Sequence, residues 1–231
     1  MQTVDCKKLR IIDVSQKITP APEPVGPDDF ARMCIEESMV WPIKEYASYV
    51  DDTIYQIIQL KTHVKTHIES PYHLDGKGKP LSAFQPDTFL GRMVYFYFDV
   101  PAGTVLTREM LEKADGGRLK GGDIAVLRTS WSKEAGGEPP VVEKDGAQYF
   151  LEKKIKMFGQ DESLTVGGAT APDTAHDIFL KHNVPLLEML CNLDQITQDV
   201  SFIVAIPGLM KIEGIDSSTT QAVIIEGMEV L

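Results

Sequence analysis

Cysteine is scarce in this chain, and basic residues are outnumbered by acidic ones. The 231 residues include three cysteines (Cys6, Cys34 and Cys191), too few and too scattered for a disulfide framework or a CxxC metal knuckle. We therefore expect free thiols in a reducing compartment. Lysine and arginine number 23 against 34 aspartates and glutamates, a formal net charge of −11. Such a surface repels phosphate groups, so nucleic acids and anionic membranes are not expected partners.

Long apolar runs and common nucleotide motifs are also missing. No stretch of about 18 apolar residues occurs, and the N-terminus MQTVDCKKLR lacks the apolar run of a signal peptide. A cytoplasmic protein is therefore expected. The glycines at 116–122 lack the lysine–hydroxyl pair of a phosphate-binding loop, and the chain has neither a dinucleotide fingerprint nor a GxSxG elbow.

Hydrophobic patterning predicts more strands than helices. Strands are expected over residues 9–15, 53–60, 92–100, 121–131, 164–169, 184–190, 201–206 and 219–231, and helices over residues 28–41, 107–115, 147–158 and 172–183. Connections of varied length exclude a repeat or a helical bundle. The chain is therefore expected to form one α/β domain over residues 1–231, with a mixed β-sheet core and flanking helices.

Histidine is rare, yet it is concentrated in one segment. Three of the five histidines, His63, His67 and His73, lie within eleven positions, together with Glu69 and Pro71. On an extended strand, positions an even number apart point to the same face. All three histidines and Glu69 share that parity, although the proline must turn the backbone before His73. The preceding β-branched run favours the extended form over a helix.

One face of this segment therefore presents imidazoles and a carboxylate, which zinc and manganese accept as ligands. A polar strand face with solvated histidines is the alternative. Further ligands would come from Glu188, an acid inside an apolar run, because a buried acid needs a partner. A water-facing edge strand is the alternative there. His176 and His182 are the remaining histidines, and the latter suits the C-terminal end of a helix.

Residues 63–73 resemble the signature of the metal-dependent cyclase-like hydrolases, the family of bacterial kynurenine formamidase and isatin hydrolase. The family pattern is His-x-Gly-Thr-His-x-Asp-x-Pro-x-His, and this chain reads HVKTHIESPYH. The strand IIDVS, the segment 99–131 and the segment 175–193 resemble further landmarks. The last carries a histidine and a glutamate twelve positions apart, His176 and Glu188. The resemblance implies a cyclase-like swivelling β/β/α fold.

The resemblance also implies roles for individual residues. His63, His67, Glu69, His176 and Glu188 would bind one or two divalent ions per chain, Zn²⁺ or Mn²⁺. His73 would be the catalytic acid/base. Homodimers or homotetramers are implied in the same way.

Two positions depart from the family pattern. Lys65 stands where the family has glycine, which suggests a backbone conformation that a lysine tolerates poorly. Glu69 stands where the family has a bridging aspartate, so its carboxylate lies one methylene further out. The loop at residues 20–29 also lacks the tryptophan of kynurenine formamidases. These changes bear on the substrate and the number of metal ions more than on the fold.

The resulting hypothesis is a hydrolase of a small amide, formamide, lactam or lactone. A divalent ion would generate hydroxide near neutral pH, and His73 would move the proton. One alternative is a metal-binding paralogue of the same fold that has lost hydrolytic power. Another is a metal-free interaction domain. Candidate residues for contact with a small-molecule substrate are the aromatic side chains of Phe30, Trp41, Tyr72 and Trp131.

Overall fold

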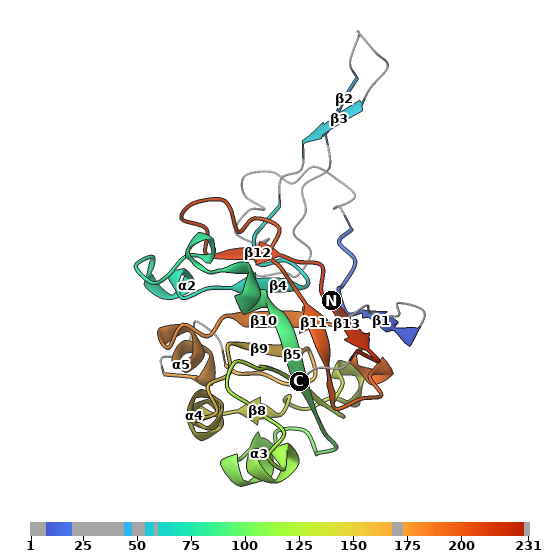
Figure 1. The fold of residues 1–231 in the computed structure, drawn as a ribbon, viewed down its shortest axis with the longest axis vertical. Helices are drawn as coiled ribbons and strands as arrows, with labels where there is room; N and C mark the ends of the chain where they lie inside the picture. The colour runs from blue at the N-terminus through green and yellow to red at the C-terminus, as the bar shows by residue number, and fades with distance from the viewer. Residues whose placement is uncertain (1–7, 20–43, 48–53, 58–59, 168–172, 229–231) are drawn as a thin grey trace, which may run out of the picture.

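A nine-stranded mixed β-sheet forms the centre of the protein (Figure 1). The computed structural model describes residues 8–19, 44–47, 54–57, 60–167 and 173–228. The sheet has the order β1-β13-β11-β5-β7-β9-β10-β4-β12. Its strands are β1 (Arg10–Asp13), β13 (Val223–Glu226), β11 (Val200–Val204), β5 (Leu90–Phe98), β7 (Ile124–Thr129), β9 (Met157–Asp161), β10 (Leu186–Leu190), β4 (His67–Glu69) and β12 (Ser217–Thr219). The mixed sheet confirms the predicted fold class.

The middle of the sheet is parallel and both flanks are antiparallel. Strands β5, β7, β9 and β10 run parallel, whereas β4 and β12 on one side and β11, β13 and β1 on the other run antiparallel to their neighbours. Strand β7 is buried along most of its length, as expected of a central strand covered on both faces. Two small pairs complete the strands, β2 (Lys44–Ala47) with β3 (Ile54–Ile57), and β6 (Val105–Leu106) with β8 (Val141–Val142).

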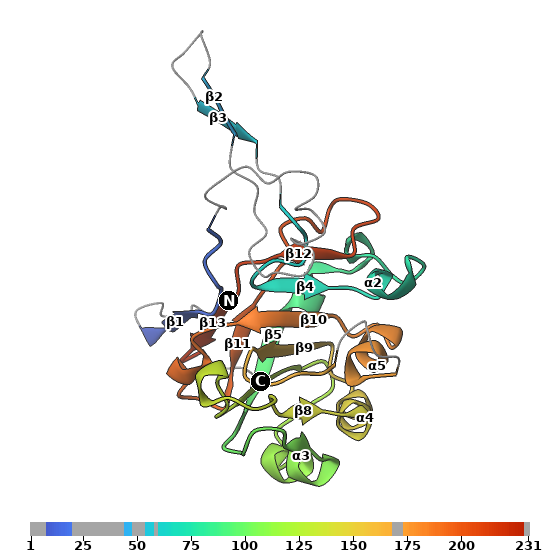
Figure 2. The same ribbon diagram turned by 180° about the vertical axis from the view of Figure 1, so that it is seen from behind.

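Three helices cover one face of the sheet, α3 (Arg108–Asp115), α4 (Lys144–Glu152) and α5 (Ala175–Lys181), as both views show (Figures 1 and 2). Aromatic rings fill the space beneath them: Phe158 stacks on Phe179 at 4.7 Å and meets Phe150 edge-on at 5.4 Å. A one-turn helix, α2 (Tyr72–Asp75), follows β4, and 3-10 turns occupy Leu81–Ala83, Pro86–Phe89, Lys133–Ala135 and Leu193–Gln195.

The other face of the sheet curls around a second apolar core. Its centre includes Ile68, Met93 and Leu187, all fully buried. Val14, just after β1, bonds with its N–H to Ala222 and accepts a hydrogen bond from the N–H of Cys191. The chain after β1 therefore lies against the end of β10, which is six strands away in the sheet order (Figure 2).

Several expected boundaries are wrong. The helix predicted over 147–158 is α4, which ends at Glu152, because Lys154 takes a positive φ of 58° and the chain continues as β9. Of the strand predicted over 164–169, the described part has one isolated pairing, Thr165 with Val141. Strand β12 was not expected. The helix predicted over 28–41 lies outside the described residues.

No helix within the described segments is long and apolar enough to cross a membrane.

The buried carboxylate of Asp115 joins α3 to α4. It accepts hydrogen bonds from the Leu119 N–H (2.7 Å) and the Tyr149 hydroxyl (2.7 Å), and it lies 3.0 Å from Lys153 Nζ. Burial alone would raise the pKa of Asp115, but these donors outweigh it and hold the pKa below its usual value of 3.8. The charged form is therefore favoured in the folded protein.

We expect Asp115→Asn to lower the free energy of unfolding at pH 7 by about 1–3 kcal/mol, the value of a hydrogen-bonded buried charge. Because the folded pKa is depressed, this contribution is present above about pH 4 and is lost as the pH falls through the folded pKa. Urea unfolding between pH 7 and pH 3 measures both effects. The control is Glu112→Gln, an exposed acid on the same helix, which should change stability by less than about 0.5 kcal/mol. Equal losses in the two variants would contradict this account.

Candidate metal centre

Strand β4 places two predicted ligands on the face that α5 covers. Glu69 pairs with Leu186 of β10 on one side and Ser217 of β12 on the other. Side chains alternate along the strand, so Ile68 enters the second apolar core while His67 and Glu69 point the other way. Both are buried, at 5% and 4% exposure.

The carboxylate of Glu69 is the point on which three imidazoles converge. Its Oε1 lies 2.6 Å from His63 Nδ1 and 3.2 Å from His67 Nε2, and its Oε2 lies 2.9 Å from Nε2 of His176 on α5. Burial would raise the pKa of Glu69, but hydrogen bonds from these rings hold it well below the usual value. Glu69 is therefore a carboxylate with both oxygens engaged.

His63 does not lie on the extended strand from which it was predicted to share a face with Glu69, yet it contacts Glu69 all the same. The segment before β4 is bent rather than extended, and Lys65 within it has φ +52°. His63 lies with Nδ1 toward Glu69 and Nε2 2.7 Å from Asp216 Oδ2. Burial opposes a charge there, but hydrogen bonds to Asp216 and Glu69 raise the pKa of His63 to about 9. Positive charge is thus favoured between these carboxylates.

Glu188 of β10 approaches the same centre. Its Oε2 lies 3.8 Å from His67 Nε2, and its Oε1 accepts a hydrogen bond from the Gln160 amide at 3.3 Å. Burial, together with the negative charge of Glu69, raises the pKa of Glu188. Both carboxylates lie within 3.8 Å of the same nitrogen, His67 Nε2, and two acids that share a site favour a cation between them.

His73 lies on α2 at the edge of the cluster. Its ring centroid is 4.4 Å from that of His63 and 5.8 Å from that of His176, and its Nδ1 lies 3.2 Å from Asp216 Oδ2. The histidine segment 63–73 therefore meets His176 and Glu188 in one place, although they lie 103 or more positions apart in the chain.

Asp216 was not predicted. It stands in the sequence without a neighbouring histidine or cysteine, in the run GIDSS. Only the pairing of β12 with β4 brings it beside His63 and His73. An acid directly before a short polar strand is too common a pattern to have identified it.

The outer nitrogens of the imidazoles, those that face away from Glu69, are held by hydrogen-bond acceptors. His67 Nδ1 donates to the C=O of Lys65 at 2.7 Å, and His176 Nδ1 lies 3.3 Å from Asp177 Oδ1. With Nδ1 held as a donor to the Lys65 C=O, Nε2 is the nitrogen of His67 that faces Glu69 and would face a bound cation. Hydrogen bonds of this kind, on the nitrogen that faces away from the ion, are typical of metal-binding histidines.

The donor set fits a divalent cation. Three groups each have ligand atoms within 4.8 Å of one another: His63 with His67 and Glu69, Glu69 with His73 and His176, and His63 with His73 and Asp216. Imidazole nitrogen and carboxylate oxygen are the ligands that zinc and manganese accept.

Two non-glycine residues beside these ligands have strained backbones. Lys65 precedes β4 at φ +52°, and Met189 follows Glu188 at φ +59°, where the register of β10 shifts. The Thr66 hydroxyl connects them: it donates to the Met189 C=O at 2.7 Å and accepts from the Gln16 N–H at 2.8 Å. Strain of this kind is concentrated at functional sites.

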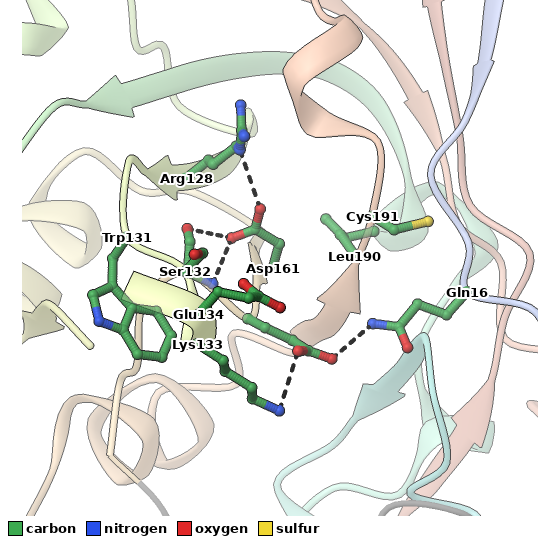
Figure 3. A pocket seen from close by; sticks show the side chains of 11 residues that line it. Gln16, Arg128, Trp131, Ser132, Lys133, Glu134, Asp161, Leu190 and Cys191 are labelled. Atoms are coloured by element: carbon green, nitrogen blue, oxygen red, sulfur yellow. Dashed lines mark hydrogen bonds and ion pairs between the residues drawn. The ribbon is translucent and has the colours of Figure 1, made fainter. Parts of the chain in front are cut away.

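Two of the four aromatic candidates, Tyr72 and Trp131, lie within the described residues, and they occupy different places. Tyr72 is half-buried on α2, next to His73. Trp131 lines a separate pocket of about 370 Å³ with Arg128, Asp161 and Cys191 (Figure 3). None of the six predicted metal or catalytic residues is among the described side chains lining it. Phe30 and Trp41 lie outside the described residues.

Comparison with known proteins gives a consistent result. The model of the Cyclase family, described as "Putative cyclase", matches residues 10–164. Isatin hydrolase of Roseibium aggregatum is 27% identical over 214 residues, covering 81% of this chain and 80% of its own. Kynurenine formamidase of Bacillus thuringiensis (strain Al Hakam) is 27% identical over 172 residues, covering 72% of this chain and 78% of its own.

A solved structure shares the fold. Isatin hydrolase A from Labrenzia aggregata, bound to benzyl benzoate, superposes with a TM-score of 0.71 and covers 95% of this chain and 94% of its own. At 19% identity this likeness concerns the architecture alone.

We expect Lys65→Gly to stabilise the protein. Relief of the left-handed backbone is worth about 1–2 kcal/mol, and the greater freedom of glycine in the unfolded chain offsets about 0.4–1 kcal/mol of it. The net gain should be about 0.5–1 kcal/mol, measured by urea unfolding in the presence of a chelator. Lys77→Gly is the control, since this exposed lysine has no positive φ. It should lose stability, and a similar loss for Lys65→Gly would refute the strain.

Proposed function

The chain belongs to the Cyclase family of metal-dependent hydrolases, and on that premise we propose that it hydrolyses a small amide, formamide, lactam or lactone with a divalent metal ion. The relatives, named as a hydrolase and a formamidase, support hydrolysis of a carbon–nitrogen bond. The observation that carries the proposal is the convergence of three imidazoles on the buried carboxylate of Glu69, with their outer nitrogens already held.

Five residues would hold the ion or ions: His63, His67, Glu69, His176 and Glu188. Zinc or manganese is proposed, with one or two ions per chain. Glu69 replaces a shorter aspartate, yet its two oxygens still reach rings on both sides of the centre. This reach supports an intact site over an impaired one.

A divalent ion bound there would lower the pKa of a water molecule toward about 7 and stabilise negative charge on a carbonyl oxygen. His73 lies beside the five ligands rather than among the rings that contact Glu69 directly. It would take a proton from water and return it to the leaving nitrogen or oxygen. The buried walls of β4, β10 and α5 would exclude bulk water and strengthen these interactions.

Two parts of the proposal rest on the chain's resemblance to its family. Assembly into a homodimer or homotetramer stays a prediction. So does substrate contact by Phe30, Trp41, Tyr72 and Trp131. Tyr72 has a position suited to it, beside His73.

We expect metal to copurify with the dialysed protein, and His67→Ala to abolish it, because that ring faces both Glu69 and Glu188. His73→Ala should keep its metal. Elemental mass spectrometry per mole of chain measures this. His182→Ala is the matched control, since within the described part of the chain this exposed ring bonds only to its own helix, at the C=O of Ile178. Metal loss from His73→Ala would assign that residue to the ligand set instead.

We expect hydrolysis of at least one member of a panel of aryl formamides, lactams and lactones above the rate without enzyme. Chelation should abolish the rate, and zinc or manganese should restore it. His73→Ala should lower kcat by about 10²–10⁴-fold, the usual contribution of an acid/base. Hydrolysis that survives chelation would exclude a metal role. Metal binding with no turnover across the panel would favour the paralogue that has lost hydrolytic power.

A further inference from the structure

Asp216 is held rigidly at the edge of the histidine cluster. It directly precedes β12, and its backbone C=O accepts hydrogen bonds from both the N–H and the hydroxyl of Ser70, each at 2.8 Å. Its Oδ1 accepts from the Ser217 N–H at 2.8 Å and the Thr62 hydroxyl at 3.4 Å. These contacts fix the orientation of the carboxylate and leave Oδ2 for other partners.

The remaining oxygen faces two imidazoles at once. Oδ2 lies 2.7 Å from His63 Nε2 and 3.2 Å from His73 Nδ1. A carboxylate oxygen accepts hydrogen bonds and does not donate them, so both nitrogens must carry protons. One oxygen therefore determines the proton position on two rings.

For His63, this assigns the inward nitrogen as the ligand atom. In the metal-free protein both nitrogens carry protons, with Nε2–H directed to Asp216 at 2.7 Å and Nδ1–H to Glu69 at 2.6 Å. Because Asp216 holds the proton on Nε2, Nδ1 is the nitrogen that would give up its proton to a cation. A carboxylate behind a metal-binding histidine fixes its tautomer and raises its basicity.

For His73, the same oxygen assigns the atom that moves the proton. Holding Nδ1–H toward Asp216 leaves the lone pair on Nε2, at the far side of the ring. An imidazole held in one tautomer by a carboxylate is oriented for acid/base work, as in the aspartate–histidine pairs of other hydrolases.

We propose that Asp216 is a positioning residue that sets the tautomers of His63 and His73 together, and so couples metal binding to the acid/base. This inference rests on the proposed function. Asp177 provides the contrast, because its carboxylate lies beside the Nδ1 of one imidazole, that of His176. The competing interpretation is that Asp216 binds a cation directly with His63 and His73, whose ligand atoms also lie within 4.8 Å of one another.

The experiment compares the full-length wild type with Asp216→Asn and the control Asp177→Asn. Nitrogen-15 NMR of histidine-labelled, zinc-loaded protein at pH 8 reports the tautomer of each ring, and only five histidines need assignment. Zinc affinity is measured by competition with a chelating dye. Kinetics on a substrate from the panel separate kcat from KM.

In the wild type, His73 should carry its proton on Nδ1. Asp216→Asn should move that proton to Nε2, at least in part, and weaken zinc binding about 10–100-fold, as loss of an outer hydrogen-bond partner does. With zinc saturating, kcat should fall by about 10-fold or more while KM stays within about threefold. Asp177→Asn should leave the His73 tautomer unchanged.

An unchanged His73 tautomer or zinc affinity in Asp216→Asn overturns the proposal. A wild-type His73 that binds zinc through Nδ1, or that carries its proton on Nε2, overturns it as well, and this needs no variant to fold. Failure of the wild type to bind zinc defeats the proposed function instead. The tautomer of His73 in zinc-free protein would then still test its hydrogen bond to Asp216.

Discussion

The centre depends on the contacts that the buried carboxylate of Glu69 makes with three imidazoles. A buried charge without partners is costly, so the elements that carry its partners must stay in register. Strand β4 is only three residues long, yet it is held between β10 and β12, and α5 supplies His176 from above the sheet. A slip of β4 by one residue would exchange Glu69 for Ile68 on that face.

The pKa shifts of the two glutamates at the centre depend on the charges around each of them. Glu69 and Glu188 lie on neighbouring strands, and the pKa of one is lowered while that of the other is raised. The difference follows from their contacts, since Glu69 meets three rings directly and Glu188 meets one at a longer distance. A further positive charge would favour ionisation of both. The centre is therefore assembled for a cation, whichever bond its substrate presents.

Local patterns in the sequence predicted much of this centre, and long-range pairing decided the rest. The close spacing of His67 and Glu69 and the position of Glu188 inside an apolar run were sufficient to predict all three as ligands. The structure brings these side chains together. The sequence did not predict the bend of the backbone at Lys65, although a lysine in place of the family's glycine indicated an unusual conformation there. Asp216 could not be found because its partners lie 143 and 153 positions earlier, and no local pattern encodes the pairing of β12 with β4.

That separation has a consequence for how the protein matures. The parts of the centre are distant along the chain, since His63 precedes Asp216 by 153 residues and the edge strand β12 comes after all the proposed ligands in the sequence. Contacts of such high sequence separation form slowly, because the entropy of loop closure comes before the contact that rewards it. During synthesis the histidine segment leaves the ribosome long before its last partner does. The carboxylate that orients His63 and His73 is therefore synthesised after all five proposed ligands, His63, His67, Glu69, His176 and Glu188.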